Sequence, residues 1–320
     1  MTELYLAVAL TFACAAIIGA GAGTLTRLLP PATAVVTLTV GAIVVSLSSL
    51  VALALLAVGA LGRNASLAHV GHWSDSVLRT AYPVPMTLSH AALVAVSLLI
   101  TYAIARAVRS IGALVLANRA GRRLGDGSGG VVVIESAVPD AYALPGSTGR
   151  VIVSTAMLAT LAPGERRVLL AHERSHLAHR HHIYVQLADT AAAINPLLRP
   201  VVGAVRSGTE RWADEDAAVE VGDRRLAATA LARAGLARAR VRRTFLAETA
   251  AVGAMHGADE NVADRARALL QPPPRGRRLL VAGVLTLAAL SLAISAESTS
   301  NVAARFDRAQ DSCASHCSGW

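Results

Sequence analysis

The sequence contains no lysine, few aromatic residues and three cysteines, and each shortage narrows the class of protein. All 30 basic residues are arginine. Aromatic residues make up 3% of the chain, so the hydrophobic fraction of 54% consists mainly of alanine, leucine and valine. The cysteines, Cys14, Cys313 and Cys317, are too few for a disulfide-rich scaffold or a cysteine-rich zinc module. Together with a mean hydropathy of +0.50, this composition excludes an ordinary soluble domain and is typical of a membrane protein.

Long apolar runs predict four transmembrane helices. The first, Leu4–Thr24, contains no charged residue and is long enough to cross a bilayer at about 1.5 Å per residue. A cleaved signal peptide is the alternative, but the residues before the run carry Glu3 and no basic side chain. The other runs lie at residues 32–61, 86–105 and 279–296. The chain therefore divides into a membrane domain of residues 1–105, a polar domain of residues 106–278, a fourth span at 279–296 and a tail of residues 297–320.

The positive charge is concentrated in the polar domain. Residues 105–278 hold 25 arginines against 16 acidic residues, which accounts for the whole net charge of +9. Arginine clusters flank this domain where it meets the membrane, and cytoplasmic segments carry such an excess. We therefore expect a multi-pass plasma-membrane protein with a cytoplasmic domain and both termini outside. In that outer compartment Cys313 and Cys317 either form a local disulfide or remain free thiols of a disordered tail.

A pattern with metal-binding spacing lies within the polar domain. Residues 172–176 read His-Glu-Arg-Ser-His, which is an HExxH pattern. On a helix His172 and His176 project from one face, so both imidazoles can bind one metal ion. Glu173 stands one step round the helix, where its carboxylate can take a proton from an attacking water. The pattern therefore predicts a zinc site with Glu173 as general base.

A third metal ligand is predicted further along the chain. Glu210 and Asp214 lie four residues apart and share a face if the segment is helical. Glu210 can then serve as the ligand, while Asp214 accepts a hydrogen bond that orients a ligand histidine. The alternative is an ordinary acidic helix face, because further acidic residues follow Asp214 directly.

The histidines after the HExxH offer a rival third ligand. His182 follows His172 by ten residues, which is the spacing of the metzincin site. His179, however, occupies the position where that fold turns sharply on a glycine. The more ordinary roles for these histidines are surface positions or contacts behind the metal ligands.

Short β-branched runs predict a small sheet ahead of the HExxH. Val131–Ile134 is bounded by glycines, and Val151–Val153 follows a cluster of turn residues. Pro163 then opens a helix at its first turn, and this helix contains the HExxH. The helical pattern runs to about Ala193, and Pro196 ends it. The polar domain is thus predicted to be a mainly helical α+β domain.

The combination of these motifs resembles a known family. Residues 139–146 (PDAYALPG), 150–154 (RVIVS), 172–176 (HERSH) and 210–218 (ERWADEDAA) are similar to the core of BlaR/MecR-type membrane zinc metallopeptidases. More distantly they resemble the HtpX and CAAX prenyl protease type. The resemblance implies a zincin domain of the gluzincin kind with one Zn²⁺ per chain. It covers about residues 131–235 by motif, and the whole chain by its order of three spans, domain and one span.

The resemblance also assigns roles to single residues. It implies three metal ligands, His172, His176 and Glu210, with Glu173 as general base and Asp214 in support. A substrate peptide is expected to pair in extended form with an edge strand beside the cleft. That strand contains Asp140, Ala141, Tyr142 and Ala143. One further histidine of some relatives falls at His181, so His181 and His182 are candidates for an auxiliary role.

The sequence therefore favours a membrane zinc endopeptidase that acts on a cytoplasmic or membrane protein. By family analogy, the substrate is a BlaI-like repressor in a signalling pathway of regulatory proteolysis, with self-cleavage as an additional event. The alternatives are an HtpX-like quality-control protease and a catalytically silent membrane scaffold. The penicillin-binding sensor domain of BlaR and MecR is not expected, because only 24 residues follow Ala296. The expected partners are a protein substrate and the bilayer, without direct nucleic-acid binding, and the oligomeric state stays open.

Overall fold

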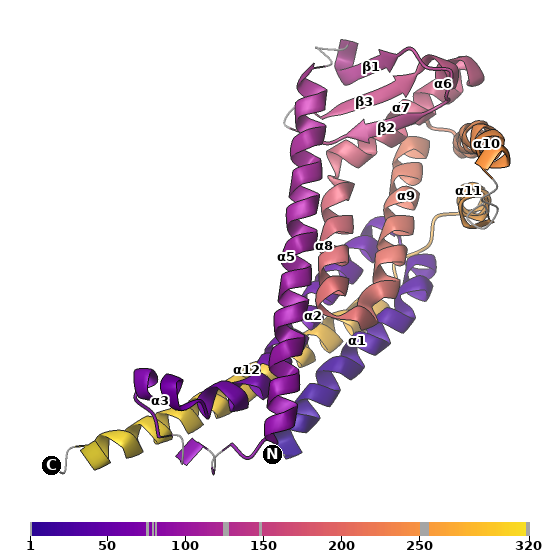
Figure 1. Cartoon of the computed structure of the whole chain (residues 1–320). Helices are drawn as coiled ribbons and strands as arrows, with labels where there is room; N and C mark the ends of the chain where they lie inside the picture. The colour runs from indigo at the N-terminus through magenta and orange to yellow at the C-terminus, as the bar shows by residue number, and fades with distance from the viewer. Residues whose placement is uncertain are drawn as a thin grey trace.

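The computed structural model describes residues 2–74, 77–78, 80, 82–123, 128–146, 149–249 and 256–317. These residues are mostly helical and include one small sheet (Figure 1). The helices are α1 Thr2–Leu28, α2 Pro31–Gly62, α3 Ala65–Gly71, α5 Met86–Arg123, α6 Thr155–Thr160, α7 Pro163–Ala178, α8 His181–Ile194, α9 Arg199–Val221, α10 Arg224–Thr249, α11 His256–Leu269 and α12 Arg278–Cys317. The strands are β1 Val131–Ile134, β2 Ala141–Leu144 and β3 Arg150–Ser154.

Four helices, α1, α2, α5 and α12, are long and apolar enough to cross a membrane. The prediction of four such apolar helices is confirmed, although two of them continue well beyond the predicted spans. Helix α5 runs on to Arg123 and α12 to Cys317, because the arginines and alanines that follow each apolar run are good helix formers. The possible disulfide of Cys313 and Cys317 concerns side chains that lie outside the described part.

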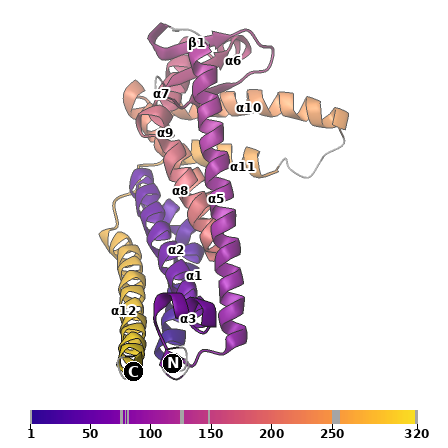
Figure 2. The same cartoon turned by 60° about the vertical axis from the view of Figure 1, so that its left-hand side comes forward.

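The small sheet lies at the far end of α5 from the two chain termini (Figures 1 and 2). Its strand order is β1-β3-β2, with β1 parallel and β2 antiparallel to the central β3. All five residues of β3 are buried, as expected for a β-branched central strand. The predicted strands at Val131–Ile134 and Val151–Val153 are confirmed, and β2 is an edge strand of the sheet.

The end of α5 is fitted closely against β2 and the turn that follows it. A Cβ atom added to Gly121 would lie 3.2 Å from Leu144 Cδ2. A Cβ added to Gly146 would lie 2.6 Å from Asn118 Oδ1. Glycine at both positions thus permits a close approach of helix and strand.

Helix α7 begins at Pro163, as predicted, but it ends at Ala178. The Glu165 carboxylate accepts a hydrogen bond of 2.8 Å from the Ala162 N–H, which caps the first turn. At the other end Arg180 has a φ of 51°, in the left-handed region, and the chain turns there before α8. The prediction of one helix from Pro163 to about Ala193 was therefore wrong, because helical propensity does not reveal a turn that tertiary packing fixes.

The two helices α8 and α9 form a hairpin that packs among the membrane helices. Ala188 and Ala191 of α8 and Val205 of α9 belong to the same buried core as Ile18 of α1 and Leu38 of α2. Both views show the hairpin running from the sheet end of the molecule down between α1, α2 and α5 (Figures 1 and 2). The polar segment between the third and fourth spans is thus not fully separate from the membrane helices.

Candidate metal centre

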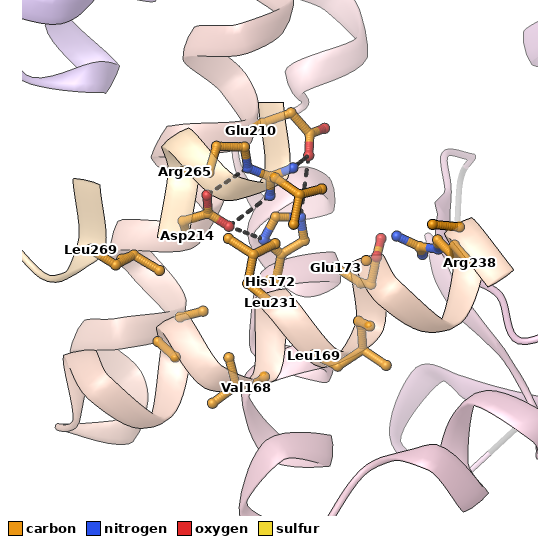
Figure 3. A pocket seen from close by; sticks show the side chains of 17 residues that line it. Val168, Leu169, His172, Glu173, Glu210, Asp214, Leu231, Arg238, Arg265 and Leu269 are labelled. Carbon is orange, nitrogen blue, oxygen red and sulfur yellow. Dashed lines mark hydrogen bonds and ion pairs between the residues drawn. The ribbon is translucent and has the colours of Figure 1, made fainter. Parts of the chain in front are cut away.

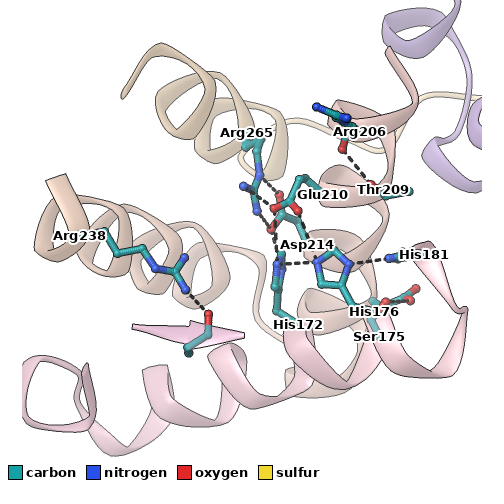
Figure 4. A network of polar contacts seen from close by, with 12 residues as sticks. His172, Ser175, His176, His181, Arg206, Thr209, Glu210, Asp214, Arg238 and Arg265 are labelled. Carbon is teal, nitrogen blue, oxygen red and sulfur yellow. Dashed lines mark hydrogen bonds and ion pairs between the residues drawn. The ribbon is translucent and has the colours of Figure 1, made fainter. Parts of the chain in front are cut away.

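Helices α7 and α9 bring two histidines and one glutamate together. His172 and His176 lie one turn apart on α7, and their Nε2 atoms are 3.2 Å from each other. Glu210 on α9 places one carboxylate oxygen 3.7 Å from His172 Nε2 and the other 3.5 Å from His176 Nε2 (Figure 4). All three ligand atoms lie within 4.8 Å of one another. The three side chains that the sequence predicted as ligands thus form a group that could hold a metal ion.

This donor set fits a zinc ion. Two imidazole nitrogens and one carboxylate oxygen are the three protein ligands of many catalytic zinc sites, which keep the fourth position open. In a tetrahedral site with bonds of 2.0–2.1 Å, neighbouring ligand atoms lie about 3.3 Å apart. The distances of 3.2, 3.5 and 3.7 Å are close to that value. The residues therefore suit zinc without a rearrangement of α7 or α9.

Asp214 fixes the orientation of the first histidine. Its Oδ1 lies 3.0 Å from His172 Nδ1, which turns His172 Nε2 toward the other ligands. Burial raises the pKa of Asp214, but hydrogen bonds from Arg265 and His172 outweigh this effect and bring the pKa to about 2. Asp214 is therefore a carboxylate at all ordinary pH values and accepts the His172 proton. This contact is the one that a residue in a supporting role would make to a histidine ligand.

Arg265 of α11 is a site residue that the sequence interpretation missed. Its Nε and Nη2 lie 2.8 Å and 2.7 Å from the two oxygens of Asp214, and its Nη1 lies 2.8 Å from Glu210 Oε2 (Figure 4). The guanidinium therefore contacts two carboxylates of α9 at once, and its contact with Asp214 is bidentate. Nothing in the local sequence distinguishes this arginine from the 24 others in the polar segment, because its partners lie 51 and 55 residues away.

Glu173 lies beside the ligand group, where a general base is needed. The side chain is buried on α7 and points away from Asp214 toward Arg238 of α10 (Figure 3). Burial raises the pKa of Glu173, although His172, Arg238 and the Ala143 backbone favour its charged form. A raised pKa makes this carboxylate a better proton acceptor than an exposed glutamate.

The comparison with known families agrees with this geometry. Residues 113–271 match the model of peptidase family M48, which includes metallopeptidases of the HtpX and CAAX protease type. Residues 113–271 are therefore a peptidase family M48 domain. This match covers the sheet, both ligand helices and Arg265, and it indicates a metallopeptidase, a class that is typically zinc-dependent. The chain has no significant match among curated proteins or among solved structures.

The edge strand of the M48 domain borders the site. Ala143 of β2 makes a backbone hydrogen bond to Glu173. Arg238 donates a hydrogen bond to the Ala141 carbonyl and lies 3.1 Å from Asp140 Oδ1 (Figure 4). The outward groups of β2 thus already have partners within the chain. Tyr142, the remaining residue predicted on this strand, is 43% exposed.

Two hollows of the M48 domain meet at His172, Glu173 and Glu210. One is a cavity of about 200 Å³ between α7, α9, α10 and α11, and its apolar walls include Leu169, Leu231 and Val262 (Figure 3). The other is an open groove of about 750 Å³ that extends from β2 past the metal ligands to α8 and α9. His172, Glu173 and Glu210 line both hollows. A peptide in the groove can therefore place one side chain in the apolar cavity.

The histidines after the HExxH take separate places in the M48 domain. His181 Nδ1 lies 2.9 Å from His176 Nδ1, and the His181 ring is 2% exposed. His181 thus contacts a predicted metal ligand from behind. His182 lines the groove, and His179 lies 3.0 Å from Asp216, so in the described residues the ligand group contains Glu210 and neither of these.

The protonation of His172 should determine how the affinity for zinc depends on pH. Burial lowers the pKa of His172, but Asp214, Glu210 and Glu173 outweigh burial and raise it. The pKa of His176 falls to about 4, first through burial and then through the neighbouring His172. A metal ion must therefore displace a proton from His172 but not from His176.

We expect zinc affinity to rise by up to about tenfold per pH unit where His172 titrates. Competition with a chromogenic chelator at about pH 6, 7 and 8 measures this slope. Asp214→Asn removes the charge that raises the pKa of His172, so this variant is expected to show a shallower slope. Equal slopes in the two proteins would contradict the role given to Asp214.

Proposed function

We propose that the M48 domain is a zinc-dependent endopeptidase with Glu173 as its general base. The observation that carries this proposal is the convergence of His172, His176 and Glu210, with Glu173 lining the same groove. A structural zinc site has four protein ligands, whereas this group offers three and leaves the fourth position open beside Glu173. The M48 match supports the metallopeptidase class independently of this geometry.

The chain's own residues account for the proton transfers. His172, His176 and Glu210 would hold zinc, which would supply Lewis-acid catalysis when bound. Glu173 accepts the proton of the attacking water and then donates it to the nitrogen of the departing amine. Burial, which raises the pKa of Glu173, makes its protonated form stable enough to act as that donor.

The substrate is proposed to lie as an extended strand along β2. Within the described residues β2 pairs with β3 on one side only, so its other edge has side-chain partners but no neighbouring strand. On that edge Arg238 donates a hydrogen bond to the Ala141 carbonyl. A bound peptide is proposed to donate its own N–H to this carbonyl in place of Arg238. The groove beneath the edge leads directly to Glu173 and the metal ligands.

The side of the membrane and the substrate are part of the same proposal. The arginine excess of residues 105–278 supports a cytoplasmic domain and outer termini in a plasma-membrane protein. The sequence resemblance to BlaR/MecR-type proteins supports a BlaI-like repressor as substrate in regulatory proteolysis, and the HtpX-type likeness supports membrane-protein quality control. Accessibility labelling of a tag near residue 127 tests the orientation, and labelling from outside intact cells would refute it.

Zinc content distinguishes the proposed ligand set from its rival. Glu210→Ala removes one of three ligands, so we expect purified protein to retain well under a tenth of the wild-type zinc. His182→Ala is the matched control and is expected to retain one zinc per chain. The reverse result would favour the metzincin spacing, and zinc-free wild-type protein would favour a silent scaffold. Elemental analysis of the detergent-purified proteins measures both.

A further inference from the structure

The tip of the α8–α9 hairpin reaches the middle of the membrane helices. Asn195, which is fully buried between the two helices, donates a hydrogen bond of 2.9 Å to Ser49 Oγ. Ser49 stands near the midpoint of the 32-residue α2. On the other side, a Cβ added to Gly19 of α1 would collide with the Leu197 carbonyl oxygen. The hairpin tip is thus held between two candidate membrane spans.

An ion-pair cluster marks the level at which the hairpin leaves the apolar part of the molecule. Asp189 of α8 lies 3.1 Å from Arg106 of α5 and 2.9 Å from Arg206 of α9. Arg106 is the first charged residue after the apolar run of α5, and charged residues at a span end mark the bilayer surface. Arg206 therefore stands close to that surface.

The height of the proposed metal ligands above the bilayer follows from the level of this ion-pair cluster. Glu210 is four residues beyond Arg206 on α9, which corresponds to about 6 Å along the helix. The hairpin tip at Arg199 lies seven residues in the opposite direction, about 10 Å below the same level. Arg211, next to Glu210, donates a hydrogen bond to the Thr26 carbonyl near the end of α1. The catalytic centre is therefore one helical turn from the bilayer surface.

The open groove continues toward the bilayer. From β2 and the metal ligands it extends to Val185 of α8 and Gly203 of α9. Gly203 precedes Arg206 by three residues, so the lower end of the groove lies below the level of the ion-pair cluster. A chain that leaves the bilayer at this point has a direct path to Glu173.

The hairpin has the composition that such a position requires. From Thr190 to Val205 the sequence contains one charged residue, Arg199, and most of the other residues are alanine, leucine, isoleucine and valine. An arginine inside the bilayer is unfavourable, and this cost falls when its long side chain reaches back to the headgroups. The buried Asn195 has its hydrogen-bond partner on α2, as a polar group in an apolar environment needs.

We propose that the α8–α9 hairpin is inserted into the bilayer and that the enzyme cuts membrane-anchored proteins in the segment directly beside their span. The first part concerns only the fold. The second part rests on the proposed peptidase function. The occupant of the groove is thus the polar stretch that follows a transmembrane helix of the substrate, and it enters from the hairpin side.

Cysteine labelling in proteoliposomes tests the insertion. The native cysteines are replaced, and a single cysteine is introduced by Leu197→Cys at the hairpin tip or Val219→Cys at the other end of α9. Both side chains are exposed on the protein itself, at 45% and 78%. A membrane-impermeant maleimide is supplied both outside and inside the liposomes, so that it reaches both faces of the bilayer. We expect it to label Val219→Cys but not Leu197→Cys, and to label Leu197→Cys once detergent dissolves the bilayer. Equal labelling in intact bilayers would overturn the insertion.

A pair of model substrates tests where the enzyme cuts. Each is a single-span protein with a randomised polar segment, placed directly after the span in one and after a flexible spacer of about 30 residues in the other. The same randomised segment is also supplied as free peptides. Mass spectrometry of the products locates each cut in proteoliposomes that contain wild-type enzyme or Glu173→Gln.

We expect cuts by the wild type alone, within about ten residues of the span, and roughly 100-fold faster than in free peptides because binding in one membrane raises the effective concentration. Equally fast cleavage of the distant segment and of free peptides would overturn the inference and leave the proposed peptidase function intact. Equal products from wild type and Glu173→Gln would instead overturn the peptidase function, and with it the second part of the inference.

Discussion

Glu173→Gln is expected to lower kcat by about 10²- to 10⁴-fold while leaving one zinc per chain, because general acid–base catalysis contributes on that order. Glutamine keeps the size and hydrogen-bonding shape of the side chain but cannot take a proton from water. The three proposed ligands, His172, His176 and Glu210, are untouched, so metal content should not change. Cleavage of denatured casein by detergent-purified protein, together with elemental analysis, measures both quantities.

Glu220→Gln is a matched control for this substitution. Glu220 belongs to α9 and pairs only loosely with Arg174, at 4.0 Å across an exposed surface. Exposed pairs of this kind contribute about 0–1 kcal/mol, so this variant should keep wild-type activity and stability. If Glu173→Gln retained wild-type kcat with full zinc occupancy, the base would have to be another group.

Arg265→Ala is expected to destabilise the M48 domain by about 3–5 kcal/mol, because it leaves a buried carboxylate without its charged partner. Asp214 is 5% exposed, and the Arg265 side chain is 10% exposed. Hydrogen bonds from Arg265 and His172 hold the pKa of Asp214 at about 2 against the effect of burial, so Arg265→Ala removes the first of the contacts that stabilise its charged form. For a domain of this size the loss corresponds to a fall in Tm on the order of 10 °C.

Arg267→Ala is the matched control two residues along α11. Arg267 pairs with Asp264 at 2.7 Å, but both side chains are more than 70% exposed. Its removal should therefore change stability by about 0–1 kcal/mol. Thermal unfolding of the two variants in the same detergent compares them directly. Similar Tm values would show that the Arg265 cluster does not hold α11 against α9.

Some of this architecture is readable from the sequence because its determinants are local. Helical spacing places His172 and His176 on one face, and the same spacing relates Glu210 to Asp214. Uncharged runs of about 20 residues identify four apolar helices without any knowledge of their packing. The short strands of the sheet follow from β-branched residues between turn signals.

Other features depend on contacts between distant segments and leave no local pattern. Arg265 becomes a site residue only when α11 packs against α9, 51 residues away from Asp214 in sequence. Helical propensity alone predicts one continuous helix to about Ala193, but the chain turns at Arg180. The place of Asn195 beside Ser49 likewise depends on a contact across 146 residues. Sequence periodicity contains no information on such pairings.

The continuous α5 has a mechanical consequence. An unbroken helix of 38 residues is about 57 Å long and resists bending, so its two ends move together. One end begins at Met86, whose sulfur accepts a hydrogen bond from Arg63 beyond the end of α2. The other end is fitted against Leu144 of β2 through Gly121. A tilt imposed on α5 at the far face of the membrane therefore displaces the edge on which a peptide would be aligned for cleavage.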